Sequence, residues 1–404
     1  MPTTMNAQAV EDEDYHWVAA WTSMPQLVEP NNMPPSPFNG GGGVFRGATL
    51  RQTFYMTLDA ERIRLQISNT FGGSDLPITA ATIALPAGGG AGVAGIDTST
   101  LKELTFNNGS PSTTIPRGQI AYTDPIDFKI SSQTNIAVSL YFQHGQSGSS
   151  ITGHPGSRTT SHMQSGNRIR EATLAGGNTN HWYFVSAVDA WVPKNYSAFV
   201  ILGDSITDGR GSTDNRNNRW PDLLLARLKK EGINHISIAN QAAGGNAILS
   251  GGLGPTLLSR YKRDALGVAG VKYVMIFEGV NDLGNSSPDS GTQNSLAIRL
   301  QQAYGQIARD CHAAGIKTIG ATIAPFSGSG QSYSNPAREQ TRVRVNNWIL
   351  NSGTFNATVD FGVVLADPAQ KSQLAREYDG GDHLHPNVAG FQAMADAVPL
   401  DFFN

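Results

Sequence analysis

Apolar and polar residues alternate over much of the first half of the chain. Within residues 62–67 and 135–142, apolar side chains occupy every second position. A period of two predicts half-buried β-strands that turn one face toward a core. Turn-rich stretches separate such runs, notably residues 39–43, 86–95 and 145–150. No helical period precedes residue 200, so the pattern predicts an antiparallel β-sandwich or jelly roll.

After Pro193 short apolar runs alternate with helical periods. The runs predict five strands, at residues 199–202, 236–239, 273–277, 318–323 and 361–365. The helical periods cover residues 220–230, 295–314, 337–351 and 388–397. Strands and helices in alternation predict parallel βαβ units with right-handed crossovers. We therefore expect two domains, an all-β domain at 15–193 and an α/β domain at 194–404.

Composition supports this division and excludes some partners. A chain of 404 residues with 39% hydrophobic residues is long enough for two packed cores, and 45 glycines supply many turns. The balance of 29 basic against 32 acidic residues, with no basic cluster longer than Lys229-Lys230, argues against binding to nucleic acid. No apolar run approaches the roughly 18 residues of a membrane span, so we expect no integral membrane segment. The sequence does not indicate an oligomeric state.

The single cysteine excludes an intrachain disulfide and a thiolate metal cluster. Cys311 lies on a stripe of apolar residues at helical spacing, with Leu296, Leu300, Tyr304 and Ile307. This placement predicts a packed thiol rather than a nucleophile.

The sequence favours an extracellular protein. Residues 1–14 are polar and acidic without an apolar core, so this chain carries no visible signal peptide. Four N-x-S/T sequons suit a secretory route in a eukaryote, at Asn108, Asn195, Asn285 and Asn356. We expect a secreted protein whose leader is not part of this chain.

Candidate chemistry begins with Ser205, in the segment Gly-Asp-Ser-Ile-Thr-Asp-Gly at 203–209. This serine follows the first predicted parallel strand, at the edge where open α/β sheets bind ligands. Gly203 permits a tight turn, so the geometry suits an exposed nucleophile. The alternative is that Asp204, Ser205 and Thr207 only cap a helix.

A second candidate segment is Asp-His-Leu-His at 382–385. If it turns helically, the Asp382 carboxylate can accept from one ring nitrogen of His385 while the other nitrogen faces outward. A serine nucleophile needs such an orienting pair. His383 is a rival base, but we expect its side chain to point away. A metal role for the three residues is the other alternative, and no further ligand cluster accompanies them, so we expect no metal.

Two more segments end neighbouring strands of the predicted sheet. Residues 240–246 follow the second strand and residues 277–282 follow the third. They would bring a backbone N–H and a side-chain amide beside Ser205, as an oxyanion hole requires, although each could be an ordinary turn. The order Ser, Asp, His is that of α/β-hydrolases, but Thr207 replaces the second glycine of their G-x-S-x-G elbow, which argues against that fold.

Together the four segments resemble the SGNH hydrolases, the GDSL-type lipases and esterases, over about residues 197–404. Ile206 stands where the family's namesake motif has leucine. The other motif residues match Gly245 in the second block, Asn281 in the third, and Asp382 and His385 in the fifth. Gly244 beside Gly245 leaves the backbone oxyanion donor open by one residue.

The resemblance implies a flavodoxin-like three-layer α/β/α domain with five parallel strands in the order 2-1-3-4-5. It also implies ester hydrolysis through an acyl-enzyme, without a cofactor. Ser205 would attack, His385 would act as base and then acid, and Asp382 would orient His385. The oxyanion would be held by the Ser205 N–H, the Gly245 N–H and the Asn281 amide.

The first half resembles, more loosely, the β-sandwich that precedes the hydrolase domain in some of these proteins, at residues 48–72 and 152–161. It could be a carbohydrate-binding module, a wall of the acyl pocket or a brace. Its aromatic residues Trp17, Trp21, Trp182 and Tyr183 could form a sugar platform, but alternation places most such residues in the core. Asp208, Arg219 and Trp220 also look like those of two-domain members, and we interpret them as structural.

The sequence thus predicts a metal-independent, secreted serine esterase of the carboxylesterase or lipase class, acting on a small-molecule or polysaccharide ester. A carbohydrate acetylesterase is the nearest alternative, favoured by the sandwich. A lipase or phospholipase comes next, although no loop is strongly apolar. A glycan-binding protein with an inactive hydrolase half is a further alternative, and the intact set of five site residues argues against it.

Overall fold

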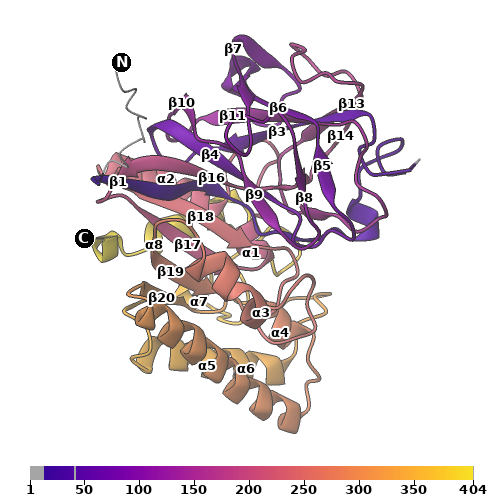
Figure 1. Ribbon diagram of the computed structural model, residues 1–404. Coiled ribbons are helices and arrows are strands. Elements are labelled where there is room, and N and C mark those ends of the chain that lie inside the picture. The colour runs from indigo at the N-terminus through magenta and orange to yellow at the C-terminus, as the bar shows by residue number, and fades with distance from the viewer. Residues whose placement is uncertain (1–12, 41, 404) are drawn as a thin grey trace, which may run out of the picture.

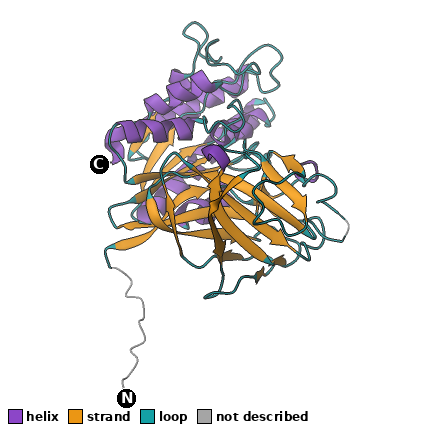
Figure 2. Cartoon of the chain, turned by 90° about the horizontal axis from the view of Figure 1, so that it is seen from above, coloured by secondary structure: helices purple, strands orange, loops and turns teal. Residues whose placement is uncertain are grey.

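The structure is a computed structural model that describes residues 13–40 and 42–403. A β-sandwich, indigo to magenta in Figure 1, lies against an α/β domain drawn in salmon to yellow. Seen from above, the strands of the sandwich and the helices of the second domain occupy opposite sides of the molecule (Figure 2). The predicted combination of an all-β region with an α/β domain is confirmed.

The sandwich consists of two antiparallel sheets. The six-stranded sheet has the order β14 (Gly177–Thr179), β13 (Ser161–Ser165), β3 (Ala48–Tyr55), β11 (Asn135–Phe142), β6 (Ala80–Pro86) and β7 (Ile96–Leu104). The five-stranded sheet has the order β1 (Tyr15–Thr22), β16 (Val185–Pro193), β4 (Ala60–Ser68) and β10 (Ile126–Ile130), with β9 (Ile120–Tyr122) also paired to β4. The predicted alternation is confirmed, because Ile63, Leu65 and Ile67 face a core shared with Val138 and Leu140.

Short strands complete the sandwich. One small sheet joins β15 (Trp182–Tyr183), β12 (Thr152–His154) and β2 (Gln26–Leu27), and another pairs β5 (Leu76–Ile78) with β8 (Thr113–Ile115). A turn of 3-10 helix, η1 (Pro30–Asn32), follows β2, and a second, η2 (Ala87–Gly89), follows β6. The small sheet with β12 lies at the end of the sandwich that reaches the site described below.

The α/β domain contains a parallel sheet of five strands in the order 2-1-3-4-5, as predicted. Its strands are β18 (Ile236–Ala242), β17 (Ser197–Gly203), β19 (Val271–Phe277), β20 (Lys317–Ala321) and β21 (Ala357–Val359). The prediction of a strand at 361–365 is wrong: that run forms helix α7 (Phe361–Val364), and the fifth strand precedes it. Asp360 separates the two elements, because its side chain caps α7 by accepting from the Val363 N–H at 3.1 Å.

Helices cover both faces of this sheet. Alternate residues of β17 point to opposite sides, so Phe199 and Ile201 pack with α2 (Trp220–Lys230) and α8 (Val388–Ala397). Val200 and Leu202 pack with α5 (Ser290–Ala313) and α6 (Pro336–Asn351). Shorter helices lie beside the strand ends: α1 (Ser205–Asp208), α3 (Leu257–Tyr261), η3 (Lys262–Leu266), α4 (Val280–Gly284) and, at the carboxyl end, η4 (Leu400–Phe403). The predicted three-layer fold is confirmed.

The predicted core position of Cys311 is confirmed. Its side chain is buried on α5 among the apolar residues of that face. Burial raises the pKa of the thiol to about 12, so it stays protonated at neutral pH. An inert packed thiol follows from both observations.

The two domains share an extensive contact around the first strands of each. The Ala19 N–H of β1 donates to the Ala269 carbonyl at 3.0 Å, and the Thr22 hydroxyl donates to the Asn240 carbonyl at 3.0 Å. Because β16 ends at Pro193 and β17 begins at Ser197, we place the domain boundary in the connection 194–196. Throughout residues 13–40 and 42–403, no helix has both the length and the apolar character needed to cross a membrane.

Candidate active site

Ser205 occupies the first position of α1, immediately after β17. The cap of this helix is Asp204, whose carboxylate accepts from the Ile206 N–H at 3.0 Å, so the Ser205 hydroxyl is not needed for capping. At Gly203 a Cβ atom would lie 2.7 Å from the Thr207 hydroxyl, which explains the glycine before the turn. The strand and helix together present the Ser205 hydroxyl at the carboxyl edge of the sheet.

A chain of hydrogen bonds joins Ser205, His385 and Asp382. Ser205 Oγ lies 2.8 Å from His385 Nε2, and His385 Nδ1 lies 2.7 Å from Asp382 Oδ2. Since a carboxylate only accepts, Nδ1 carries the ring proton and leaves Nε2 to accept from the serine. The other oxygen of Asp382 accepts from the backbone N–H groups of Leu384 and His385.

The segment that carries this pair is a series of bends, not the helical turn that the sequence suggested. The helix α8 begins only at Val388, capped by Asn387. The Asp382 side chain bonds the backbone two and three residues on, which closes the turn locally and holds the carboxylate beside the His385 ring. The contact between the two side chains therefore forms without a helix.

The environment keeps the imidazole of His385 neutral. Burial lowers the pKa of His385, an effect that the hydrogen bond and charge of Asp382 oppose and that Arg210 and Arg158 reinforce. Burial raises the pKa of Asp382, but hydrogen bonds from His385 and Leu384 outweigh it and hold that pKa below its usual range. A neutral histidine beside an ionised carboxylate is the state in which a histidine can accept a proton from a hydroxyl.

His383 lies apart from this arrangement. Its Nδ1 is 2.6 Å from the Asp379 carboxylate, and its backbone has φ +58°, which turns the ring away from Asp382. Unlike His385, it does not line the pocket beside Ser205. The structure thus places only one of the two candidate histidines next to the serine.

The second and third strands deliver the other candidate residues to the same edge. The Gly244 N–H donates to Asp208 Oδ2 at 2.9 Å and is engaged. In the described parts of the chain the N–H of Gly245, whose φ is +70°, has no acceptor, so of the two glycines it is the one with a free donor. One amide hydrogen of Asn281 goes to the Asn246 carbonyl at 2.7 Å, while its Oδ1 accepts from the Tyr333 hydroxyl at 2.9 Å. These bonds fix the amide orientation and leave the second N–H available.

All five candidate residues line one pocket of about 540 Å³. Its walls come from both domains, and the sandwich contributes Gln26, Glu29, Asn32, Pro155, Gly156 and Arg158. Side chains with polar ends dominate, whereas Leu253, Leu384 and Tyr333 are its main apolar residues. The sandwich thus forms part of the pocket wall.

A buried contact between a histidine and a carboxylate, which the sequence did not reveal, connects the domains beside the nucleophile. His154 Nε2 of the sandwich lies 2.8 Å from Asp208 Oδ1, and His154 Nδ1 lies 3.0 Å from the Met24 carbonyl. Arg219 donates to the Asp208 carbonyl at 3.0 Å and to the Ser157 carbonyl of the sandwich. The structural interpretation of Asp208 and Arg219 agrees with these contacts.

Other pocket residues escaped the sequence because they come from loops without a motif. Tyr333 follows a Gly/Ser-rich connection, Arg210 follows α1, and Arg158 belongs to the sandwich. The available signal was the stretch 152–161, whose resemblance to two-domain hydrolases left its role open. Only the packing of the two domains brings it to Ser205.

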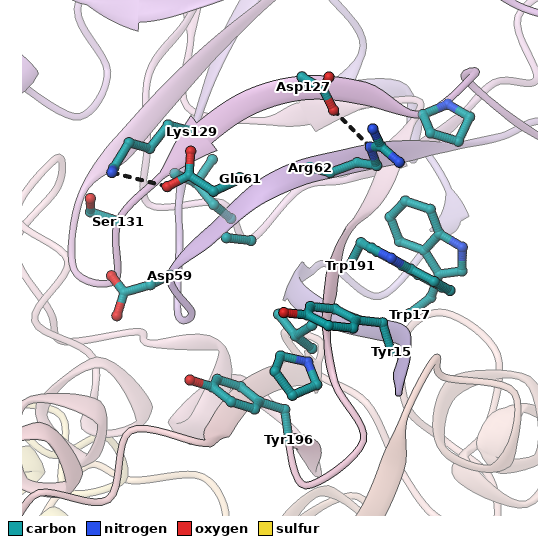
Figure 3. A pocket seen from close by; sticks show the side chains of 15 residues that line it. Tyr15, Trp17, Asp59, Glu61, Arg62, Asp127, Lys129, Ser131, Trp191 and Tyr196 are labelled. Atoms are coloured by element: carbon teal, nitrogen blue, oxygen red, sulfur yellow. Dashed lines mark hydrogen bonds and ion pairs between the residues drawn. The ribbon is translucent and has the colours of Figure 1, made fainter. Parts of the chain in front are cut away.

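A larger hollow of about 820 Å³ lies on the outer face of the five-stranded sheet (Figure 3). Trp17 of β1 lies opposite Trp191 of β16 with ring centroids 5.0 Å apart, and Tyr15 stacks on Trp191 at 6.3 Å. Tyr196 lines the same hollow and precedes β17, whereas Ser205 follows the far end of that strand. The hollow therefore lies at the opposite end of the parallel sheet from the nucleophile.

The four aromatic residues Trp17, Trp21, Trp182 and Tyr183 do not form a common sugar platform, the less favoured of the two interpretations. Trp21, Trp182 and Tyr183 are buried in the sandwich core, where Trp21 and Trp182 pack edge to face. Trp17 alone faces the outer surface. As the alternation suggested, most of these rings lie in the core.

Metal chemistry finds no support in the described residues. In that part of the chain no group of three or more His, Cys, Asp or Glu side chains is arranged to hold a metal ion. Asp382 and His385 face each other and Ser205 instead.

Comparison with known proteins bears on this site directly. Residues 201–393 match the model of the GDSL-like Lipase/Acylhydrolase family. This half of the chain is a GDSL-like lipase/acylhydrolase domain. The domain is therefore a hydrolase of esters, and the five candidate site residues lie within the matched range.

A search of solved structures matches a lipase/acylhydrolase from Enterococcus faecalis (20% identity, TM-score 0.38), which aligns over 50% of this chain and 92% of its own. An acetyl xylan esterase from Geobacillus stearothermophilus (20% identity, TM-score 0.37) aligns over 50% of this chain and 94% of its own. A GDSL-like lipase from Bacteroides thetaiotaomicron (16% identity, TM-score 0.37) aligns over 50% and 85%. Among curated proteins, none matches the chain.

Proposed function

We propose that the GDSL-like domain is a serine esterase in which Ser205, His385 and Asp382 form the catalytic triad. The observation that carries the proposal is the continuous pair of hydrogen bonds at 2.8 and 2.7 Å through His385, opening on a pocket. This order of nucleophile, base and orienting carboxylate is what acyl transfer to a serine requires.

The proposed reaction has two steps. Ser205 Oγ attacks the ester carbonyl while its proton passes to His385 Nε2, and the same proton then goes to the departing alcohol, which leaves an acyl-serine. A water molecule then attacks the acyl group and gives a proton to His385. The carboxylic acid leaves, and the proton passes from His385 back to Ser205. In both steps Asp382 stabilises the imidazolium.

Negative charge develops on the carbonyl oxygen in each step. The free N–H of Gly245, the second amide hydrogen of Asn281 and the N–H of Ser205 supply three donors at the same edge of the sheet. Because Asn246 and Tyr333 fix the Asn281 amide, this donor is oriented before the substrate binds.

The character of the pocket favours a polar alcohol and a short acyl group. The pocket opens between the two domains, and most of the described residues that line it are polar or charged. A carbohydrate acetylesterase acting on a polysaccharide is accordingly the second candidate, since the polar wall from the sandwich suits hydroxyl-rich groups. A lipase would need an apolar acyl site that the lining residues do not supply.

Substitution of the nucleophile tests the proposal. Ser205→Ala should lower kcat on p-nitrophenyl acetate by about three orders of magnitude or more while circular dichroism stays unchanged. Ser332→Ala, a serine of the same pocket without a role in the reaction, is the matched control and should stay within threefold. A fluorophosphonate should label Ser205 in the parent chain, as read by mass spectrometry. Activity of Ser205→Ala within tenfold of the parent would remove Ser205 from the mechanism.

We also infer that the protein acts outside the cell. All four sequons have exposed asparagines, and in the described chain the side chains of Asn108 and Asn195 form no hydrogen bond that a glycan would break. Expression through a eukaryotic secretory route should yield a protein whose mass falls on treatment with an N-glycosidase. An unchanged mass would count against this route.

A further inference from the structure

Donors and acceptors in the active-site pocket do not balance. Three carboxylates line it, and each has a donor: Glu29 accepts from the amides of Gln26 and Asn32, Asp208 from His154 and Gly244, and Asp382 from His385. The same pocket is lined by two arginines, Arg158 and Arg210. Within residues 13–40 and 42–403, neither guanidinium forms a hydrogen bond or an ion pair. The pocket therefore contains two cationic donors for which it offers no acceptor.

Arg158 is held in place by the backbone and not by a partner for its side chain. Its φ is +49°, a left-handed conformation that is costly for any residue other than glycine. Its carbonyl accepts from the Asn215 N–H at 2.9 Å. The Nε atom of Arg158 is buried without an acceptor in the described structure. A buried unpaired donor costs about 1 to 3 kcal/mol, so a ligand that accepts from it is stabilised accordingly.

Arg210 reaches the pocket from the other domain. It follows α1 directly, and its N–H donates to the Ser205 carbonyl at 2.9 Å, which ties its position to that of the nucleophile. Both arginines are close enough to His385 to disfavour its positive charge. The two cations thus approach the reacting atoms from opposite domains.

We propose that Arg158 and Arg210 bind an anionic group, a carboxylate or a phosphate, which the ester substrate carries near its scissile bond. Guanidinium groups bind both anions with paired hydrogen bonds, and a pocket from which most water is displaced strengthens them. The proposal rests on the esterase function above and adds a role for the sandwich, which supplies one of the two arginines. Arg158 and Arg210 are then residues of substrate specificity.

The first experiment compares matched esters. The parent enzyme should hydrolyse 4-acetoxybenzoate with a kcat/KM at least tenfold above that of methyl 4-acetoxybenzoate, its uncharged counterpart, mainly through a lower KM. This preference should shrink as NaCl rises from about 20 to 500 mM, because salt screens charges. A parent enzyme that hydrolyses the two esters equally well would overturn the proposal while leaving the esterase function intact.

Substitutions assign the effect to the two residues. Arg158→Gln and Arg210→Gln should each reduce kcat/KM for the anionic ester at least fivefold more than kcat/KM for the neutral ester, and Arg158→Lys should restore part of the preference. Arg117→Gln, an exposed arginine outside the pocket, removes the same charge and should change neither rate. Equal losses on both esters would show a structural role and contradict the proposal.

Binding separates this inference from the esterase function. Isothermal titration of Ser205→Ala with 4-acetoxybenzoate should show saturable binding that Arg158→Gln weakens at least fivefold, whether or not the parent turns the ester over. Absence of binding would overturn the inference. Two further probes distinguish the source of the anion: faster hydrolysis of O-acetylated polygalacturonate points to an acidic polysaccharide, and faster hydrolysis of phosphatidylglycerol micelles points to a lipid headgroup.

Discussion

Two histidines lie two residues apart in the sequence, yet they face different carboxylates. His385 lies between Asp382 and Ser205, and His383 pairs with Asp379. We expect His385→Ala to abolish turnover, with a loss of about three orders of magnitude or more in kcat, and His383→Ala to retain most of it. Measured kcat values for the two variants, each with a circular dichroism spectrum, decide this. A dead His383→Ala beside an active His385→Ala would refute the assignment.

The environment of His385 also predicts how the rate depends on pH. Its pKa is lowered from 6.5, chiefly by burial, and only the neutral ring accepts the serine proton. Therefore kcat/KM should fall on the acid side with a midpoint below 6.5 and be constant above it until another group titrates. A rate profile from pH 4 to 8 tests this. A midpoint clearly above 6.5, or a flat profile, would contradict a buried histidine base.

Asn281 offers a choice between a role in catalysis and a role in the turn. The residue caps nothing in α4, and its amide bonds Asn246 and Tyr333. If the free N–H binds the oxyanion, Asn281→Ala should lower kcat by about 10² to 10³ with KM nearly unchanged. The two lost hydrogen bonds should lower the melting temperature by only a few degrees.

Tyr333→Phe serves as the control for Asn281. It removes one of the two bonds that orient the amide but leaves the amide itself, so its loss in kcat should be well below that of Asn281→Ala. If Asn281→Ala keeps kcat within threefold while the melting temperature drops, the asparagine is structural and backbone donors alone form the oxyanion hole.

At the scale of residues, sequence reasoning reached those that belong to a strand end or a short local motif. Ser205, Asp382 and His385 could be proposed together because a turn after a strand and a pair three residues apart can be recognised in the sequence. Arg158 and His154 could not, since their place beside Ser205 depends on how a sandwich loop packs against α1. The free N–H of Gly245 likewise became distinct from that of Gly244 only when Asp208 was seen to engage the latter.

At the scale of elements, long periodic segments were predicted well and short apolar runs were not. The helices at 220–230 and 388–397 match the predicted bounds, because ten or more residues specify a helical period. The run at 361–365 contains only five, and strand and helix are then indistinguishable by periodicity. In the structure residues 357–359 form the fifth strand, and the Asp360 side chain caps the helix that follows.

The connection between α1 and the sandwich predicts a difference between Arg219, which is buried, and Arg227, which is partly buried. Arg219 donates to the Asp208 carbonyl at the end of α1 and to the Ser157 carbonyl beside Arg158, while Arg227 donates to the Ala395 and Val398 carbonyls within the hydrolase domain. Both Arg219→Ala and Arg227→Ala should cost about 2 to 3 kcal/mol in stability. Only Arg219→Ala should also raise KM several-fold, because it loosens the loop that lines the pocket.

Melting curves and steady-state kinetics of the two variants test this difference. Each variant removes an arginine that donates to two carbonyls, but Arg219 also lies 3.5 Å from the Asp222 carboxylate. Its stability loss should therefore be at least as large as that of Arg227, and KM is the quantity that isolates the domain contact. Equal KM values for both variants would show that the wall of the pocket does not depend on Arg219.

At the scale of the whole molecule, a cluster of buried charge lies beneath the site. Arg260 is fully buried and donates to Asp264 and Glu278, both at 3.2 Å, and also to the Gly203 carbonyl before the nucleophile. Two more carboxyls, Asp204 and Asp282, are buried in the same region. Burial of several carboxyls around one guanidinium means that not all of them can be ionised at little cost.

This cluster predicts how stability depends on pH. Burial, together with neighbouring carboxylates, raises the pKa of Glu278 to about 8 and that of Asp204 to about 7. In the unfolded chain these groups ionise at their ordinary values near 4, so between about pH 5 and 8 the folded state holds more protons than the unfolded state. The free energy of unfolding should therefore fall as pH rises through this range, by at most about 1.4 kcal/mol per pH unit for each group.

Glu278→Gln tests the source of that slope, since glutamine has the shape of the protonated carboxyl and cannot ionise. Near pH 5.5 the variant should unfold within about 1 kcal/mol of the parent, because Glu278 is then protonated and Arg260 retains Asp264. Toward pH 8.5 the parent should lose stability relative to the variant. Denaturation curves at both pH values measure the difference, with the exposed Glu377→Gln as a control that should follow the parent at each pH. Parallel curves for Glu278→Gln and the parent would show that Glu278 is ionised in the folded protein throughout, and that the ion pair with Arg260 outweighs its burial.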